Sequence, residues 1–173
     1  MAEGVRTSVD PALVRAAQRG DPMALSELME LLLPYIGRIC GPIALQDGPD
    51  ATQEAMISIL RGIRGLKDPD ALFGWARVIA VREAVRIASR ASTARSSAIP
   101  VEEMGDRSDP QLVVDICDAL ARLSPQHRAV LLLRDLEGLD ETQASEVLAV
   151  RPGTVRSRLS RARGSFRKAW SHD

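Results

Sequence analysis

A run of arginines near the end of the sequence is its most specific chemical feature. From Arg151 to Lys168 the 173-residue chain has seven basic residues and no acidic one. Pro152 stands near the start of this run, and proline is favoured at the first position of a helix. Arginine donates hydrogen bonds in a planar fork that fits guanine edges and phosphates. The run therefore predicts a basic helix that binds a nucleic acid.

The expected helix, 152–170, divides into an apolar face and a polar face. Its apolar side chains recur at spacings of four, three and four residues and should face a core; they are Val155, Leu159, Ala162 and Phe166. The polar side chains off this stripe are the candidates for contact with base edges and phosphates. They are Thr154, Arg156, Ser157, Arg158, Ser160, Arg161 and Arg163.

A second, shorter helix is expected over 141–149, just before the basic one. Asp140 with Gln143 three residues later is a variant of the capping box that starts helices. Two helices joined by a tight connection have the spacing of a helix-turn-helix motif, whose second helix enters the DNA major groove. The residues alone leave one alternative open, a basic amphipathic helix that contacts an acidic partner or only favours solubility.

The whole sequence predicts an all-α fold with two small helical domains. Apolar residues follow helical spacing almost throughout, and no stretch alternates with a period of two over strand length. We expect the first domain over 10–91 and the second over 111–170. Residues 92–110 are rich in Ser, Pro, Gly and acidic residues, which predicts a flexible linker.

Prolines and glycines suggest where the helices of the first domain begin and end. Asp10-Pro11 and Asp21-Pro22 are helix start signals. Because Pro34 interrupts the second apolar stripe, we expect a kink or break near Leu33. Gly41-Pro42 and Gly48-Pro49 are expected to bracket a loop. Later helices should bury three apolar sets: Ala55, Met56, Ile59, Leu60 and Ile63; Leu72, Trp75, Ile79 and Val85; and Leu112, Ile116, Leu120 and Leu123.

Composition argues against several classes of protein. Lys and Arg total 23 and so do Asp and Glu, so the formal net charge is zero and only one face could attract a polyanion. Cys40 and Cys117 are too few for a structural zinc site, and we expect no metal or cofactor. No motif of a catalytic nucleophile or phosphate loop occurs, so we expect no enzyme. We find no signal peptide and no window approaching the ~20 apolar residues of a membrane span, and we expect a cytoplasmic protein without membrane insertion.

The sequence also resembles a known family over roughly residues 10–170. The segment GTVRSRLSRAR, 153–163, is similar to the recognition helix in region 4 of bacterial RNA polymerase sigma factors of the extracytoplasmic-function (ECF, group IV, sigma-70 family) class. Upstream, DATQEAMISILRGI and LFGWARVIAVREAV resemble parts of region 2 of the same family. The resemblance implies a subunit that gives RNA polymerase its promoter specificity.

The resemblance implies partners and roles for further residues. Region 2 of the family binds the β′ clamp coiled coil of core RNA polymerase, and region 4 meets the β flap. The polymerase-binding positions correspond here to Asp50, Gln53 and Glu54. The positions that contact the promoter −10 element correspond to Lys67, Phe73, Trp75, Arg77, Arg82 and Arg86, and the arginine-rich helix would read the −35 element. Relatives of this class often bind an anti-sigma factor as well.

The chain departs from the family pattern at several of these positions. Arg77 stands where an aromatic residue is frequent, Arg82 where asparagine is usual, and Arg86 where an acid is common. Ala149 replaces the glycine of the helix-turn-helix turn. Two alternatives therefore stay open: a sigma-like decoy that binds an anti-sigma factor without opening promoters, and a stand-alone helix-turn-helix regulator that binds duplex DNA without polymerase.

Overall fold

The computed structural model describes residues 9–94 and 110–171, and these form helices and turns without a strand. The helices are α1 (Pro11–Gln18), α2 (Pro22–Ala44), α3 (Gly48–Gly62), α4 (Leu72–Ala94), α5 (Pro110–Ala121), α6 (Pro125–Leu131), α7 (Glu141–Leu148) and α8 (Pro152–Trp170). Short 3₁₀ turns lie at Leu45–Asp47, Ile63–Gly65 and Pro69–Ala71, and a π-helical turn spans Leu132–Leu136. The all-α prediction is confirmed. Most of the predicted linker, 92–110, lies outside the described residues, but residues 92–94 belong to α4 and Pro110 to α5.

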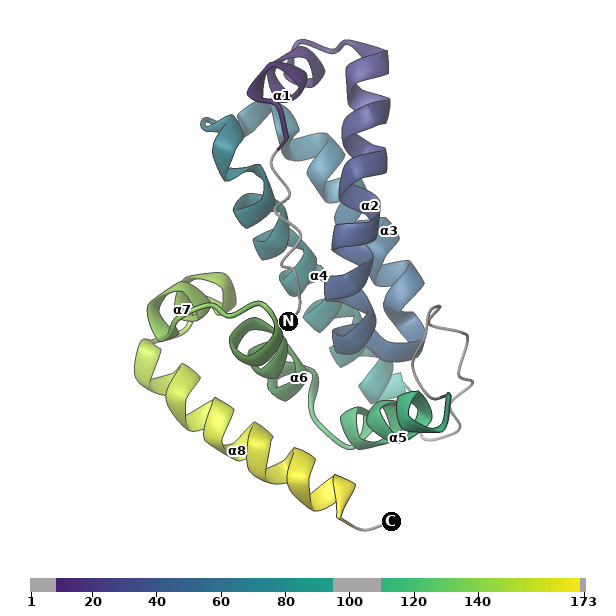
Figure 1. Ribbon diagram of the computed structural model, residues 1–173, viewed down its shortest axis with the longest axis vertical. Coiled ribbons are helices and arrows are strands. Elements are labelled where there is room, and N and C mark those ends of the chain that lie inside the picture. The colour runs from purple at the N-terminus through teal and green to yellow at the C-terminus, as the bar shows by residue number, and fades with distance from the viewer. Residues whose placement is uncertain (1–8, 95–109, 172–173) are drawn as a thin grey trace.

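In the N-terminal half, α2, α3 and α4 pack side by side and α1 covers one end (Figure 1). Most of the apolar stripe predicted for α2 is fully buried, namely Leu28, Leu32, Ile36 and Ile39, while Leu25 and Met29 are partly buried. The buried face of α4 differs in part from the predicted one: Leu72 is buried as predicted, but Trp75, Ile79 and Val85 are only partly buried. Four alanines at helical spacing are buried instead: Ala76, Ala80, Ala84 and Ala88. Their small side chains allow α4 to approach α2 and α3 closely.

Of the kink or break predicted near Leu33, the break is wrong, and so is the loop predicted from Gly41, since α2 continues through Pro34 and Pro42 to Ala44. A proline leaves the carbonyl four residues earlier without its helical donor. Those carbonyls belong here to Glu30 and Arg38, two exposed residues whose backbone water can reach. A single 3₁₀ turn separates α2 from α3.

Within the described residues, one stretch, 22–65, has the length and the mean hydropathy, 1.4 over its best window, that a membrane span requires. This differs from the expectation drawn from the sequence, which found no such window. In the structure the stretch is not one helix but α2, a turn, α3 and a second turn. Many of its large apolar side chains, including Leu28, Ile36 and Ile59, are buried inside the protein, whereas Met23, Leu31, Leu33 and Leu60 are exposed.

In the C-terminal half, α6, α7 and α8 form a compact unit, and α5 packs against α8. Ser124 caps α6 by accepting a hydrogen bond from the backbone N–H of His127, and Gly138 has the left-handed φ of +68° expected of the glycine that ends this region. The apolar stripe predicted for α5 is wrong at Leu112 and Ile116, which are exposed, while Leu120 is partly buried. Leu123 is buried as predicted, and Ala119, which the sequence did not assign to the stripe, is buried as well.

The two halves share one continuous buried cluster, which runs from the α1–α4 bundle into α6, α7 and α8. Arg128 of α6 crosses this boundary. Its Nε donates to the Ile43 carbonyl of α2 at 2.7 Å, and its Nη1 donates to the Leu123 carbonyl at 2.6 Å. Burial lowers the pKa of Arg128 to about 10, so the guanidinium stays charged near neutral pH. A charged side chain thus joins the halves where α2 ends.

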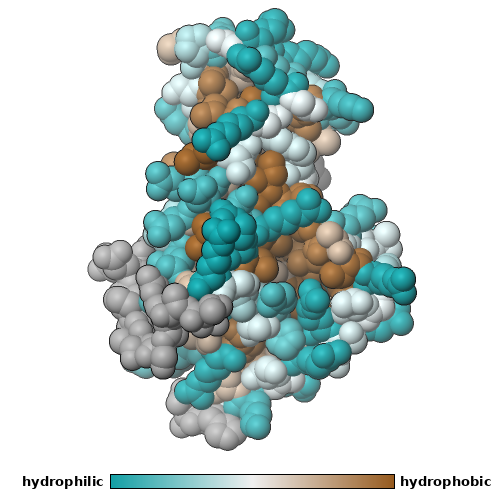
Figure 2. All heavy atoms as spheres, turned by 180° about the vertical axis from the view of Figure 1, so that it is seen from behind, coloured by the Kyte–Doolittle hydropathy of each residue, from teal (hydrophilic) through white to brown (hydrophobic). Residues whose placement is uncertain are grey.

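Large apolar side chains also reach the surface, and the view from behind shows several such patches among hydrophilic residues (Figure 2). Leu60, which the sequence places on the inner face of α3, is 44% exposed, so that prediction is wrong. Its neighbours Ala55 and Ile59 are buried as expected. The 15-residue α3 presents a narrow buried face of small and medium side chains, and Leu60 lies at its edge.

Candidate nucleic-acid interface

Helix α8 has the two faces that its sequence predicts. Val155, Leu159 and Ala162 are buried against α6 and α7, which fixes the helix on the C-terminal half. Four of the candidate contact residues are exposed on the opposite side: Arg156, Ser157, Ser160 and Arg161. Arg163 is exposed as well, and Thr154 and Arg158 are partly exposed. All seven candidates are therefore accessible on one helix, while their contact with DNA stays a prediction.

The connection between α7 and α8 has helix-turn-helix geometry. The capping box at the start of α7 is complete, because the Gln143 N–H donates to Asp140 Oδ1 at 2.8 Å and the Asp140 N–H donates to Gln143 Oε1 at 2.9 Å. Ala149 ends α7 in the left-handed conformation, with φ 53° and ψ 45°. A non-glycine residue occupies this conformation at a cost of ~1–2 kcal/mol, because its Cβ crowds the following carbonyl. The turn therefore forms even though alanine is less favourable than glycine at this position.

Two arginines of α8 are held by carboxylates that lie outside the helix. Arg156 donates from Nε and Nη2 to both carboxylate oxygens of Glu141, at 3.1 and 3.0 Å. Arg163 forms the same kind of two-pronged pair with Asp135 of the π-helical turn. Neither carboxylate was predicted from the sequence, because they lie 15 and 28 residues away from their partners in the chain.

Positive charge is concentrated on the other flank of α8. Burial lowers the pKa of His127 below its usual value, and the charges of Arg158 and Arg161 lower it further. These three residues therefore lie close enough to influence one another. In the described residues no ion pair to a carboxylate is formed by Arg158 or Arg161, so this flank offers its charge to an outside anion.

The residues assigned to the −10 element are not gathered in one open site. Lys67 and Arg82 are exposed. The ring of Phe73 packs edge-on against Tyr35, with centroids 5.1 Å apart. Trp75 is half-buried against Gly62, where an added Cβ would lie 3.0 Å from the indole.

Arg77 is also engaged, and its contacts reach the other half of the molecule. Its Nε donates to the Tyr35 hydroxyl at 2.9 Å and lies 3.2 Å from Glu137 Oε2 in the C-terminal half. Arg86 forms an ion pair with Glu83 on its own helix. Four of the six −10 candidates, Phe73, Trp75, Arg77 and Arg86, thus contact other residues of the chain.

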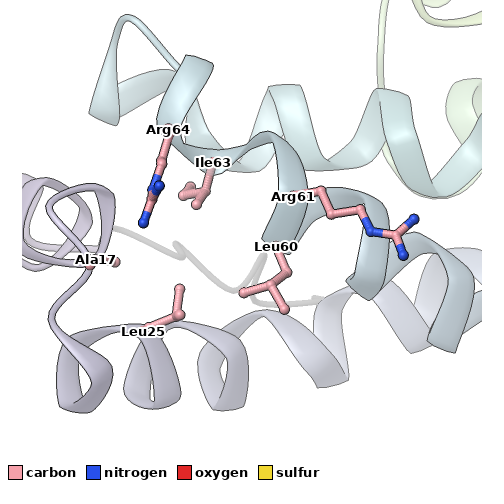
Figure 3. Close-up of a pocket in the computed structure, with 7 residues that line it drawn as sticks. Ala17, Leu25, Leu60, Arg61, Ile63 and Arg64 are labelled. Atoms are coloured by element: carbon pink, nitrogen blue, oxygen red, sulfur yellow. The ribbon is translucent and has the colours of Figure 1, made fainter.

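The residues assigned to polymerase binding lie together. Asp50, Gln53 and Glu54 are all exposed in the first turns of α3, and their spacing of three and four residues places them on one side of that helix. Near the other end of α3 a cleft of about 270 Å³ opens between α1, α2 and α3. Arg64 points into this cleft and Arg61 points away from it (Figure 3). The described residues contain no group of three or more potential metal ligands, and the cleft holds no acid–base pair that would suggest catalysis.

Comparison with known proteins identifies the family. Residues 115–165 match the family "Sigma-70, region 4", which covers α5 from Asp115 onward and most of α8. The RNA polymerase sigma factor CarQ of Myxococcus xanthus is 32% identical over 130 residues, which are 69% of this chain and 72% of CarQ. The chain belongs to the sigma-70 family of RNA polymerase sigma factors, in its ECF class.

Other relatives of this sigma factor agree. An ECF RNA polymerase sigma factor, SigE of Mycolicibacterium smegmatis, is 33% identical over 131 residues, and the chain spans only about half of it, 51%. The sigma-H factor of Pseudomonas aeruginosa is 28% identical over 182 residues and is covered to 93%. The family resemblance seen in the sequence is confirmed, and the chain is a transcription initiation factor. A stand-alone regulator is not favoured.

Two solved structures share the fold of this sigma factor. The sigma factor RpoE of Bartonella quintana, in complex with the anti-sigma factor NepR, aligns with a TM-score of 0.65 at 21% identity over 86% of this chain and 98% of that one. CnrH in complex with the cytosolic domain of CnrY aligns with a TM-score of 0.65 at 18% identity over 95% of this chain. At this identity the comparison supports the all-α, two-part architecture.

Proposed function

We propose that this sigma factor binds core RNA polymerase in the cytoplasm and directs it to promoters that carry matching −35 and −10 elements. The C-terminal part, 111–170, reads the −35 element, and the N-terminal part, 10–91, binds polymerase and opens the −10 element. The protein catalyses no covalent chemistry itself. The observation that carries the proposal is the exposed arginine face of α8 on a helix-turn-helix scaffold.

The −35 assignment is supported by the position of the arginines along α8. In recognition helices the N-terminal residues reach base edges, and later or flanking residues hold phosphates. Arg156 and Arg161 lie in the first three turns and are exposed. They are our candidates for base contact, and Thr154, Ser157, Arg158, Ser160 and Arg163 are candidates for phosphate or water-mediated contact.

The polymerase assignment is supported by the exposed carboxylates of α3. Asp50 and Glu54, with Gln53 between them, form a compact acidic surface at a helix N-terminus. Such a surface complements a basic partner and remains outside the buried core. We propose that it contacts the β′ clamp coiled coil, while the C-terminal part contacts the β flap.

The −10 assignment requires a change in the contacts between the two halves. Arg77 and Phe73 would have to exchange their contacts with Glu137 and Tyr35 for contacts with the melted strand. Extruding a base costs a few kcal/mol, which stacking and phosphate contacts must offset. Lys67 and Arg82 are already exposed and could make the first phosphate contacts.

The test is transcription in vitro with purified core polymerase and a promoter selected by this sigma factor. Replacing Arg156 or Arg161 by alanine should lower promoter discrimination by ~1–3 kcal/mol, about 5- to 150-fold. Arg167→Ala is the matched control, because Arg167 is exposed on the same helix but lies near its C-terminal end. Equal effects of all three substitutions would contradict the assignment of base contacts to the start of α8.

Transcription in vitro and two binding assays separate the proposal from its alternatives. A sigma-like decoy gives no promoter-dependent transcript with core polymerase. A stand-alone regulator shifts duplex DNA without polymerase. For the polymerase surface, Asp50→Lys should weaken binding to the core enzyme while leaving the fold intact, because Asp50 is exposed and has no role in the core. Unchanged affinity for core polymerase would argue against that surface.

We also propose that an anti-sigma factor binds this sigma factor. The support is that one solved neighbour, the sigma factor RpoE, was determined in complex with the anti-sigma factor NepR, and the other, CnrH, in complex with the cytosolic domain of CnrY. The proposal predicts that a bound partner of this class prevents association with core polymerase. Core polymerase that binds equally well in its presence would contradict this part of the proposal.

A further inference from the structure

Glu141 contacts the helix α8 without being part of it. It is the first residue of α7, directly after the capping residue Asp140, and it reaches across the helix-turn-helix turn to Arg156. The side chain of Glu141 is 29% exposed, whereas that of Arg156 is 77% exposed. The carboxylate is therefore partly enclosed, and the arginine it holds extends into solvent.

The geometry of this pair decides which edge of the arginine remains available. A guanidinium has five N–H donors arranged on two forked edges, Nε with one terminal nitrogen and the two terminal nitrogens together. Glu141 accepts from Nε and Nη2, at 3.1 and 3.0 Å, so it occupies the first edge. Among residues 9–94 and 110–171, no other hydrogen bond from the Arg156 side chain is formed, so the edge formed by Nη1 and Nη2 is available to donate. That edge can form the two-pronged contact with O6 and N7 of guanine.

We propose that Glu141 is a positioning residue that sets the specificity of −35 recognition, by holding Arg156 with its terminal edge presented to a guanine. The inference rests on the proposed function and adds to it a residue outside the recognition helix. An unheld arginine loses rotamer freedom when it binds and can also reach neighbouring phosphates. A held arginine has lost part of that freedom beforehand and is confined to one position in the groove.

The pair formed by Asp135 and Arg163 provides a matched comparison. It has the same chemistry, but Arg163 lies seven residues further along α8 than Arg156. Because only the N-terminal part of a recognition helix reaches base edges, the second pair should affect phosphate contact and not base choice. Asp135→Asn is therefore the control for the loss of one carboxylate beside the helix.

The experiment measures binding of the reconstituted holoenzyme to a set of promoter fragments that contains every single base-pair change in the −35 element. The variants are Glu141→Gln, Glu141→Asp, Arg156→Ala and the double variant Glu141→Gln with Arg156→Ala. Glu141→Asp keeps the charge at the helix N-terminus but shortens the reach, which separates positioning from helix stabilisation. Circular dichroism melting of each variant checks that the helix-turn-helix unit is folded.

We expect Arg156→Ala to reduce discrimination at one G·C pair by about fivefold or more. Glu141→Gln and Glu141→Asp should reduce discrimination at the same base pair, with other positions changing less than twofold. The double variant should discriminate no worse than Arg156→Ala alone. Asp135→Asn should shift affinity for all fragments equally and leave their ranking unchanged.

Three outcomes would overturn the inference. Glu141→Gln could raise affinity for all fragments uniformly, which would mean that the carboxylate only repels phosphates. It could leave the discrimination at the Arg156-dependent base pair unchanged, in which case the proposed function stands and the positioning role is wrong. A wild-type holoenzyme with no preference among the −35 fragments would instead refute the proposed function itself.

Discussion

Replacing Arg128 with methionine should destabilise the protein far more than replacing any exposed arginine. Arg128 is 7% exposed and donates to the carbonyls of Ile43, Leu123 and Leu120. Methionine has a similar length and preserves apolar packing, but it has no donor. The substitution therefore removes the hydrogen bonds that join α6 to the end of α2 and leaves the packed volume nearly unchanged.

The size of the loss in unfolding free energy follows from the backbone carbonyls that no longer have a hydrogen-bond donor. The hydrogen bonds to Ile43 and Leu123 are both buried, and an unsatisfied buried acceptor costs ~1–3 kcal/mol. The two together amount to about 2–6 kcal/mol. Relief of the desolvated guanidinium offsets part of this cost. We expect the free energy of unfolding to fall by about 2–4 kcal/mol.

Urea unfolding followed by circular dichroism measures this loss. With a slope of about 2 kcal/mol per molar urea, the midpoint should fall by about 1–2 M. Arg122→Met is the matched control, because Arg122 is exposed just before α6, and it should change stability by less than about 0.5 kcal/mol. Arg128→Lys, which keeps one compact donor group, should fall between the two.

Equal midpoints for Arg128→Met and Arg122→Met would refute the reasoning, because they would mean that water satisfies the freed carbonyls as well as the guanidinium does. If Arg128→Met unfolds in two transitions and not in one, the result would support the role of Arg128 in coupling the two halves. Since one buried cluster spans both halves, the wild-type protein should unfold in one step, and the Arg128 contacts contribute to that coupling.

Three further predictions concern the turn, the thiols and the histidine. Ala149→Gly should raise the free energy of unfolding by about 0.5–1 kcal/mol, measured in urea, because glycine adopts the left-handed conformation without strain; a decrease would contradict the turn geometry. Burial raises the pKa of the Cys40 thiol to about 11, so in the folded protein an alkylating reagent should modify Cys117 first, as mass spectrometry would show. The pKa of His127 should lie below about 6.5 in an NMR titration and rise in Arg161→Ala. Because the unfolded state then binds this proton more readily than the folded state, the contribution of His127 to stability falls as the pH drops below about 6.5. A His127 pKa that does not change in Arg161→Ala would contradict the electrostatic effect of the α8 arginines.

Short-range sequence patterns predicted the features of α8 that indicate the family. The arginine run of α8, its apolar stripe and the capping box at Asp140 each depend on residues a few positions apart, and all are present in the structure as expected. The family resemblance implied roles for α3 and α4, which stay predictions, and the comparisons confirmed the family. All of these features depend on residues within a single helix or its cap.

Errors in the sequence analysis arose where a helix meets other helices. The sequence predicted large apolar residues at the buried face of α4, but close packing against α2 and α3 selected the alanine stripe that includes Ala76 and Ala80. Pro34 suggested a break, but it stands where the freed carbonyl of Glu30 is exposed, so the helix continues. In both cases the outcome depended on which parts of a helix its neighbours bury and which they leave exposed.

What the sequence by itself determined is the all-α class, the helix-turn-helix unit and the polar face of α8, because hydrophobic periodicity and capping act within one or two turns of chain. Only the tertiary structure decided which partner each polar group takes. Arg128 bonds carbonyls that every residue possesses, and Glu141 and Asp135 meet their arginines across a turn. Such pairings depend on where whole helices come to lie, and no local pattern of residue types records that.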